Sequence, residues 1–143
     1  MCGENNDMFN CIDLKRAISP QNDGGDTPLV SEIIDMQGNS CLTFAIATGS
    51  LADAGATFTA LVEEGDAANL SDAAAVADGD LLGTEALASF TQASDNKCFK
   101  IGYKGVKRYV RLTITPSGNV GDAYISVLAI LCPQLQPAAN PPA

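Results

Sequence analysis

The stretch KRYVRLTIT, residues 107–115, decides the fold of this chain. Apolar side chains occupy every second position, at Val110, Leu112 and Ile114, and polar or aromatic ones lie between them. An alternation with period two predicts a β-strand with one face in the core and the other in solvent. A strand of this kind needs a second layer to cover its apolar face.

Other short segments with the composition of β-strands lie before and after this stretch. We predict further strands in LVSEIID (29–35), CLTFAIA (41–47), ATFTALVEE (56–64), TEALASFTQ (84–92), CFKIGYKG (98–105) and DAYISVLAILC (122–132). The last of these is apolar on both faces, which is typical of a central strand. About seven or eight short strands separated by turn residues predict an all-β fold, an antiparallel β-sandwich of the jelly-roll kind in a single domain.

The two ends of the chain have a different composition. Residues 1–28 are polar, with two prolines and a Gly-Gly pair, and predict an extended N-terminal arm in which only Ile12, Leu14 and Ile18 are suited to docking. The sandwich domain then covers residues 29–132, and residues 133–143 form a Pro-rich C-terminal tail. The Ala- and Asp-rich stretch 66–84 is interpreted as a loop with a short turn.

Charge divides along the chain. The net charge is −9, and residues 50–95 hold nine acids and no base, whereas residues 97–111 hold six of the eight bases and no acid. The overall charge argues against nucleic acid and against an anionic membrane as partners. The basic stretch, Lys97–Arg111, is therefore expected to be a pair of adjacent strands joined by a hairpin turn at Lys104, Lys107 and Arg108. Its charges are expected to face an acidic surface, either in this chain or in a partner.

Little in the sequence supports catalysis. There is no histidine, which removes Ser-His-Asp, Cys-His and His-metal arrangements, and there is no phosphate-binding glycine motif. We expect neither enzymatic activity nor a cofactor. A cation near Asp72, Asp78 and Asp80 stays open, although this stretch does not match a calcium-binding EF-hand loop.

The cysteines and the N-terminus bear on the cellular compartment. The five cysteines have no CxxC spacing, so we interpret Cys41, Cys98 and Cys132 as free thiols in or beside strands. A Cys2–Cys11 link is the alternative in an oxidising medium. The first residues lack the pattern of a signal peptide, which predicts synthesis in a cytoplasm.

Three segments resemble a family of small tailed-phage and prophage proteins that decorate, or cement, capsids. They are LVSEIIDMQGNSCLTFAIATGSLADAGATFTALVEEGD (29–66), AAAVADGDLLGTEALASF (73–90) and CFKIGYKGVKRYVRLTIT (98–115), and the likeness runs over residues 29–131. The GYKGVKRYVRL portion is its most specific part. The arm and the tail lie outside the likeness.

The resemblance implies a structural virion protein on the capsid exterior, bound to the major capsid protein, stabilising contacts between capsomers and self-associated as a dimer or trimer. The residues we expect to contact a partner are Ile12, Leu14, Lys15, Arg16, Lys104, Lys107, Arg108, Tyr109 and Arg111. Charge reversal at Arg108 and Arg111 would then abolish assembly and spare folding. The alternatives are another virion component, at the head–tail joint or on a fibre, and a carbohydrate- or nucleic-acid-binding module.

Overall fold

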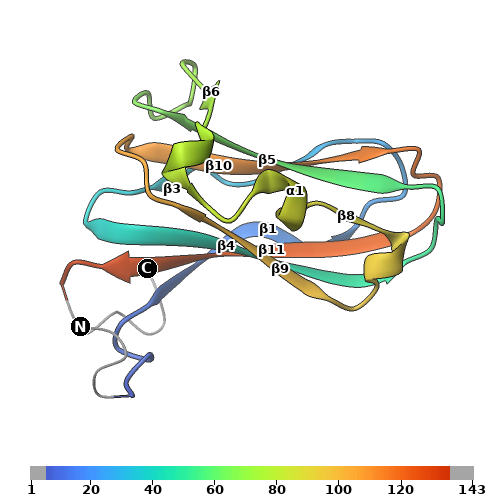
Figure 1. Ribbon diagram of the computed structural model, residues 1–143, viewed down its shortest axis with the longest axis horizontal. Coiled ribbons are helices and arrows are strands. Elements are labelled where there is room, and N and C mark those ends of the chain that lie inside the picture. Colours follow the sequence, from blue (N-terminus) through green and yellow to red (C-terminus); the bar gives the residue numbers. More distant parts are fainter. Residues whose placement is uncertain (1–5, 136–143) are drawn as a thin grey trace.

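The computed structural model describes residues 6–135, and these form two antiparallel sheets packed face to face (Figure 1). The predicted all-β sandwich is confirmed. In spatial order the five-stranded sheet contains β1 (Asp13–Asn22), β11 (Ala123–Pro133), β4 (Asn39–Leu51), β9 (Cys98–Tyr103) and β7 (Leu81–Leu82).

The six-stranded sheet is built around two long strands. Its main path is β2 (Leu29–Val30), β10 (Tyr109–Ser117), β5 (Thr57–Gly65) and β6 (Ala74–Ala75), while β3 (Ile34–Asp35) pairs with β10 and β8 (Phe90–Thr91) pairs with β5. The helical pieces are short: the 3₁₀ turns η1 (Asp78–Asp80) and η2 (Gln92–Ser94), and the helix α1 (Glu85–Ala88).

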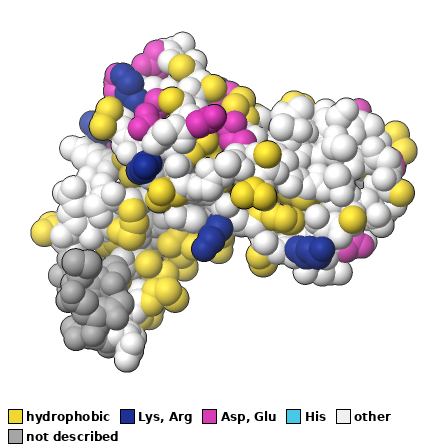
Figure 2. All heavy atoms as spheres, in the orientation of Figure 1, with side chains coloured by type: hydrophobic (Ala, Val, Ile, Leu, Met, Phe, Trp, Pro, Cys, Tyr) yellow, Lys and Arg dark blue, Asp and Glu magenta, His cyan; other side chains and the backbone are white. Residues whose placement is uncertain are grey.

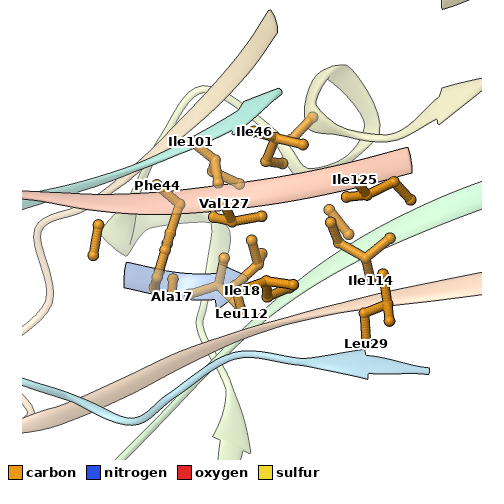
Figure 3. Close-up of a cluster of buried hydrophobic side chains, with 14 of the residues drawn as sticks. Ala17, Ile18, Leu29, Phe44, Ile46, Ile101, Leu112, Ile114, Ile125 and Val127 are labelled. Atoms are coloured by element: carbon orange, nitrogen blue, oxygen red, sulfur yellow. The ribbon is translucent and has the colours of Figure 1, made fainter. Parts of the chain in front are cut away.

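The core lies between the sheets and follows the period-two pattern (Figure 3). Phe44 and Ile46 of β4 face inward with Val127 of β11, and Leu112 and Ile114 face them from β10. Each of these five side chains is at most 1% exposed. The alternation predicted for β4, β5 and β10 is therefore confirmed, and burial of these side chains is the main force that holds the two sheets together.

From β4 onward, successive long strands alternate between the two sheets. The chain passes from β4 to β5, and from β9 through β10 to β11, and each step changes sheet. Consequently β9 pairs with β4 and β7, whereas β10 pairs with β5, β2 and β3. The prediction that the basic stretch forms a pair of adjacent strands is wrong, because the loop between β9 and β10 carries the chain across the sandwich.

The structure also differs from the expected N-terminal arm. Residues 13–22 form β1, which pairs with β11, and Ala17 and Ile18 are buried in the core. Two register shifts, between Arg16 and Ile18 and between Ile18 and Gln21, interrupt the period-two alternation from which the strand could have been predicted. These irregularities, together with Pro20, are typical of an edge strand protected against pairing with another chain.

The segment predicted as a strand at 84–92 instead holds α1, β8 and part of η2. Thr84 caps the helix, because its side chain accepts a hydrogen bond from the Leu87 N–H at 3.1 Å. The helix lies along the edge of β5 between the short stretches that pair with β8 and β6. There the Val62 N–H donates to Glu85 Oε1 at 2.8 Å and the Ala60 N–H donates to Ser89 Oγ at 3.0 Å.

Cys41 and Cys132 form a disulfide, so the prediction that both are free thiols is wrong. They lie directly opposite one another on β4 and β11, with a Cα–Cα distance of 5.1 Å, although 91 residues separate them in the chain. Cys98 is a free, exposed cysteine. The alternative Cys2–Cys11 link involves Cys2, which lies outside the described residues.

Candidate partner-binding surface

The strands of the basic stretch present their charges on opposite sides of the molecule. Lys100 projects from β9 on the outside of the five-stranded sheet, and Arg111 projects from β10 on the outside of the six-stranded sheet. A flat partner surface that covers one of these charges leaves the other in solvent. The stretch is therefore two separate features, and each has its own neighbours.

Three of its bases are paired with acids of the same chain. Lys107 Nζ lies 2.5 Å from Asp66 Oδ2, Arg108 contacts both carboxylate oxygens of Asp35 at 2.9 Å, and Arg111 Nε lies 2.9 Å from Glu63 Oε2. The guanidinium of Arg108 also lies 5.0 Å from the centre of the Tyr109 ring. At these three positions, the bases of the basic stretch therefore pair with acids of the same chain.

The hydrogen bonds of Arg108 and Lys107 to their acids shift pKa values. The hydrogen bond from Arg108 lowers the pKa of Asp35, and the one to Asp35 raises the pKa of Arg108. Likewise, the hydrogen bond to Asp66 raises the pKa of Lys107. The shifts favour the charged form of each group, so the pairs persist at neutral pH.

The loop 104–108, which joins β9 to β10, is held at both of its ends. The Lys107 N–H donates to Tyr103 Oη at 3.0 Å, and Tyr103 Oη donates to Glu64 Oε2 at 2.5 Å. Burial, followed by the hydrogen bond to Glu64, raises the pKa of Tyr103, so its hydroxyl keeps its proton. On the other side, the Lys104 N–H donates to Asp80 O at 2.9 Å, which leaves Val106 at the tip, 96% exposed.

The outer face of the five-stranded sheet carries a more continuous surface. In one row across the sheet, Arg16 of β1 lies beside Leu128 of β11, Ala45 of β4 and Lys100 of β9. Strands are about 4.8 Å apart, so the two bases stand roughly 14 Å apart with the two apolar residues between them. Leu128 is 47% exposed.

The neighbouring row extends this apolar surface to the edge of the sheet. It runs from Leu14 through Ile130, Thr43 and Gly102 to Leu82. A Cβ at Gly102 would lie 2.9 Å from Leu82 Cβ, so glycine is the residue that lets Leu82 lie across β9. We call the residues of these two rows the sheet face; they are Leu14, Arg16, Thr43, Ala45, Leu82, Lys100, Gly102, Leu128 and Ile130.

A groove of about 490 Å³ continues the same side of the sheet toward the far end of β1. Pro20, Ala47, Gly49, Tyr124 and Ser126 are among its lining residues. The absence of a side chain at Gly49 leaves room for Tyr124, because a Cβ at Gly49 would lie 3.0 Å from Tyr124 Cβ. The groove adds an aromatic, partly apolar hollow to the sheet face.

Hydrophobic side chains lie on the lower side of Figure 2, where the five-stranded sheet runs, with separate basic side chains beside them. Acidic and basic side chains mix instead at the end that carries β6. The outside of the six-stranded sheet has another character: outward positions of β5 and β10 hold Thr57, Thr59, Thr113, Thr115 and Ser117. The two sides of the sandwich therefore suit different environments.

The residues that the sequence nominated for partner binding fall into three groups. Leu14 and Arg16 lie on the sheet face, and Arg16 also lies 3.4 Å from Glu32. Ile12 immediately precedes β1, and Lys15 lies opposite Ala129 within the sheet, both half-buried. The third group belongs to the loop 104–108 and to β10: Lys104, Lys107, Arg108, Tyr109 and Arg111.

Sequence reasoning missed the rest of the sheet face. Leu128 and Ile130 belong to DAYISVLAILC, whose two apolar faces indicated a strand buried on both sides. The observed strand buries Val127 and Ala129, while Leu128 is half-exposed. The sequence did carry the signal, because a second apolar face has to pack against something. The pattern alone predicts that this second face packs inside the domain and not against a partner.

Two kinds of site are absent from the described part of the chain. Within residues 6–135 no group of three or more His, Cys, Asp or Glu side chains is arranged to hold a metal ion. Among the same residues there is no helix long and apolar enough to cross a membrane.

No protein-family model matches the sequence, and no curated protein matches it either. Among solved structures, the fold is similar to the SPBc2 prophage-derived protein YomS, with a TM-score of 0.47, 12% identity and coverage of 84% of this chain and 93% of that one. It is also similar to a chain of Broad Bean Stain Virus, with a TM-score of 0.44, 9% identity and coverage of 91% and 92%.

A third similar structure contains the CBM22-1 and GH10 modules of xylanase Xyn10B from Clostridium thermocellum. Its TM-score is 0.41 at 11% identity, and the match covers 87% of this chain and 26% of that one. These likenesses are too distant to carry an argument about function, which has to come from the surface of this chain.

Proposed function

We propose that this protein is a structural virion component that binds the outer surface of a phage capsid and stabilises contacts between capsomers. The observation that carries the proposal is the sheet face. Exposed Leu128 lies there in one row with Arg16 and Lys100, and exposed Leu14 lies in the neighbouring row. Exposed apolar side chains beside an arginine are suited to a protein partner. The resemblance to decoration proteins agrees with such a role.

The charges of the sheet face favour an acidic, partly apolar partner over a second copy of the same face. In a two-fold dimer through this face, Arg16 and Lys100 of one copy would approach the same bases of the other. Like charges brought together at an interface are unfavourable. The major capsid protein is therefore the proposed occupant, and self-association, as a dimer or trimer, is assigned to other surfaces of the molecule.

A matched pair of substitutions tests the proposal. Leu128 and Val30 have similar exposure, 47% and 55%, but Leu128 lies on the sheet face and Val30 pairs with Thr113 on the outside of the other sheet. We expect Leu128→Asp to abolish retention on purified expanded capsids and Val30→Asp to retain it. Circular dichroism and the thermal midpoint establish that both variants are folded.

Other outcomes would overturn the proposal. Equal capsid binding by both variants would remove the sheet face from the contact. A reconstruction of the particle with the protein in a few copies at the head–tail joint would support the alternative virion component. Retention on single-stranded DNA or on a glycan array, with capsids not bound, would support a nucleic-acid- or carbohydrate-binding module instead.

A further inference from the structure

Two buried side-chain oxygens at one end of the sandwich accept no hydrogen bond. They are Asp23 Oδ2 and Asn119 Oδ1, and their residues are 7% and 2% exposed. Buried polar groups are almost always paired, because an unpaired acceptor loses its water and gains nothing in return. A third such atom, Asp13 Oδ1, belongs to the opposite end of β1.

The two residues touch one another and are fixed in place. Asn119 Nδ2 donates to the backbone oxygens of Asp23 at 2.8 Å and of Gly25 at 3.1 Å. Because the amide nitrogen has two carbonyl partners, the orientation of the Asn119 amide is set and its oxygen is left over. The Asp23 N–H donates to Ala123 O at 2.8 Å, which ties the same loop to the start of β11.

Further carboxylates surround this pair. Asp26 accepts hydrogen bonds from the N–H groups of Gly118 and Asn119, and Asp53 accepts one from Val120 N–H at 3.0 Å. Asp122 Oδ1 accepts a hydrogen bond from Asn22 Nδ2 at 2.8 Å. None of the four ion pairs found within residues 6–135 includes any of these acids, so their charge is not balanced by a neighbouring base.

We propose that the junction of the loops 23–26 and 118–119 binds a hard divalent cation, with Ca²⁺ as the best fit, through Asp23 Oδ2 and Asn119 Oδ1. Carboxylate and amide oxygens are the donors that Ca²⁺ prefers, with water and backbone carbonyls completing six to eight ligands. A water molecule would also satisfy two acceptors, but it would leave the charge of Asp23 and its acidic neighbours uncompensated. A cation binds both unpaired oxygens and also compensates the negative charge of Asp23 and its acidic neighbours.

The site is distinct from the one that the sequence left open. In that site, the carboxylate of Asp72 accepts hydrogen bonds from the N–H groups of Asp66 and Ala67, and these bonds lower the pKa of Asp72. The proposed site contains one free carboxylate oxygen, so its affinity should be modest, with a dissociation constant on the order of 10⁻⁴ to 10⁻³ M.

Thermal denaturation of the full chain, stripped with a chelator and followed by circular dichroism, tests the proposal. A tenfold excess of Ca²⁺ over its dissociation constant should raise the midpoint by about 4 °C at constant ionic strength. Asp23→Asn should weaken the Ca²⁺ response at least tenfold. The control Asp78→Asn, which changes an exposed acid of the other loop, should respond as the parent does.

A midpoint that Ca²⁺ leaves unchanged up to 10 mM, or an Asp23→Asn variant that responds like the parent, would overturn the proposal. If Asp23→Asn does not fold, amide NMR of the parent protein decides. Ca²⁺ should shift the signals of residues 23–26 and 118–120 first. Shifts confined to residues 66–80 would place the cation elsewhere and refute the assignment.

Discussion

Arg111 and Glu63 lie directly opposite one another on β10 and β5, and both Nε and Nη2 of the arginine contact Glu63 Oε2. The two side chains are only 27% and 19% exposed. Their pairing across the six-stranded sheet shows that this part of the basic stretch belongs to the fold. The structure therefore changes the expected result of charge reversal at Arg108 and Arg111, from lost assembly to lost stability.

The Arg111–Glu63 pair gives the first prediction. Arg111→Glu places two acids opposite one another and should lower the free energy of unfolding by about 1–3 kcal/mol. The swapped double variant, Arg111→Glu with Glu63→Arg, should recover more than half of that loss. Urea denaturation of the parent, of Arg111→Glu, of Glu63→Arg and of the double variant measures the cycle, with Lys104→Glu as the exposed control. No recovery in the double variant would contradict the pairing.

The edge of β5 gives the second prediction. Glu85→Ala and Ser89→Ala each remove the acceptor of a β5 N–H group, at Val62 and Ala60 respectively, and each should cost about 1–3 kcal/mol of stability. Leu87→Ala is the control, because Leu87 belongs to the same helix and is 74% exposed. Equal stability of all three variants, measured by thermal denaturation, would mean that the helix does not protect this edge.

The disulfide gives the third prediction. A link that closes a loop of 91 residues restricts the unfolded chain, so its removal by Cys41→Ser with Cys132→Ser should cost up to about 4–5 kcal/mol. The reduced parent protein should behave like this double variant. Cys98→Ser, at an exposed free cysteine, should leave the denaturation midpoint unchanged. A parent protein that is insensitive to reductant would contradict the pairing of Cys41 with Cys132.

Acid sensitivity is the fourth prediction. Four carboxyls of residues 6–135 have a pKa below the usual 3.8. The pKa of Asp7 is lowered by hydrogen bonds from Asn10, and that of Asp35 by its hydrogen bond from Arg108. The N–H groups of Val120 and Gly55 lower the pKa of Asp53, and those of Asp66 and Ala67 lower the pKa of Asp72. A lowered folded-state pKa stabilises the fold fully above 3.8, and that stability is lost as the pH falls through the lowered values.

The thermal midpoint should accordingly be flat near neutral pH and fall as the solution is acidified below about pH 4. Asp72→Asn should have a lower midpoint at neutral pH and a shallower acid fall than the parent protein. Asp78, an exposed acid of the same loop, supplies the control as Asp78→Asn. A midpoint that rises on acidification would reverse the assigned sign.

The sequence predicted the buried face of a strand correctly where apolar residues alternate within that strand. The alternation in residues 41–47, 56–64 and 107–115 predicted which faces of β4, β5 and β10 are buried, because each pattern is local. Relations between strands were harder. The Cys41–Cys132 link depends on the register of strands far apart in the chain, and the crossing between β9 and β10 replaced an expected hairpin.

β1 and α1 escaped prediction for opposite reasons. The register shifts of β1 hid a real strand, and a deletion of residues 1–20 would remove most of this core strand, including Ala17 and Ile18. In α1, the residues between Thr84 and Phe90 alternate as a strand does, but they serve as acceptors for the edge of β5. The sheet face was likewise visible only once the five strands β1, β11, β4, β9 and β7 were placed side by side.

The loop 104–108 has a practical consequence for engineering. Tyr103 and Asp80 anchor its two sides, and Gly105 has to stay a glycine because a Cβ there would lie 2.6 Å from Tyr103 Oη. Val106, in contrast, touches solvent over 96% of its surface. A foreign epitope inserted next to Val106 would therefore leave the domain at the end of the sandwich, clear of both sheets. If the protein coats a particle as proposed, this tip is the place from which to display cargo.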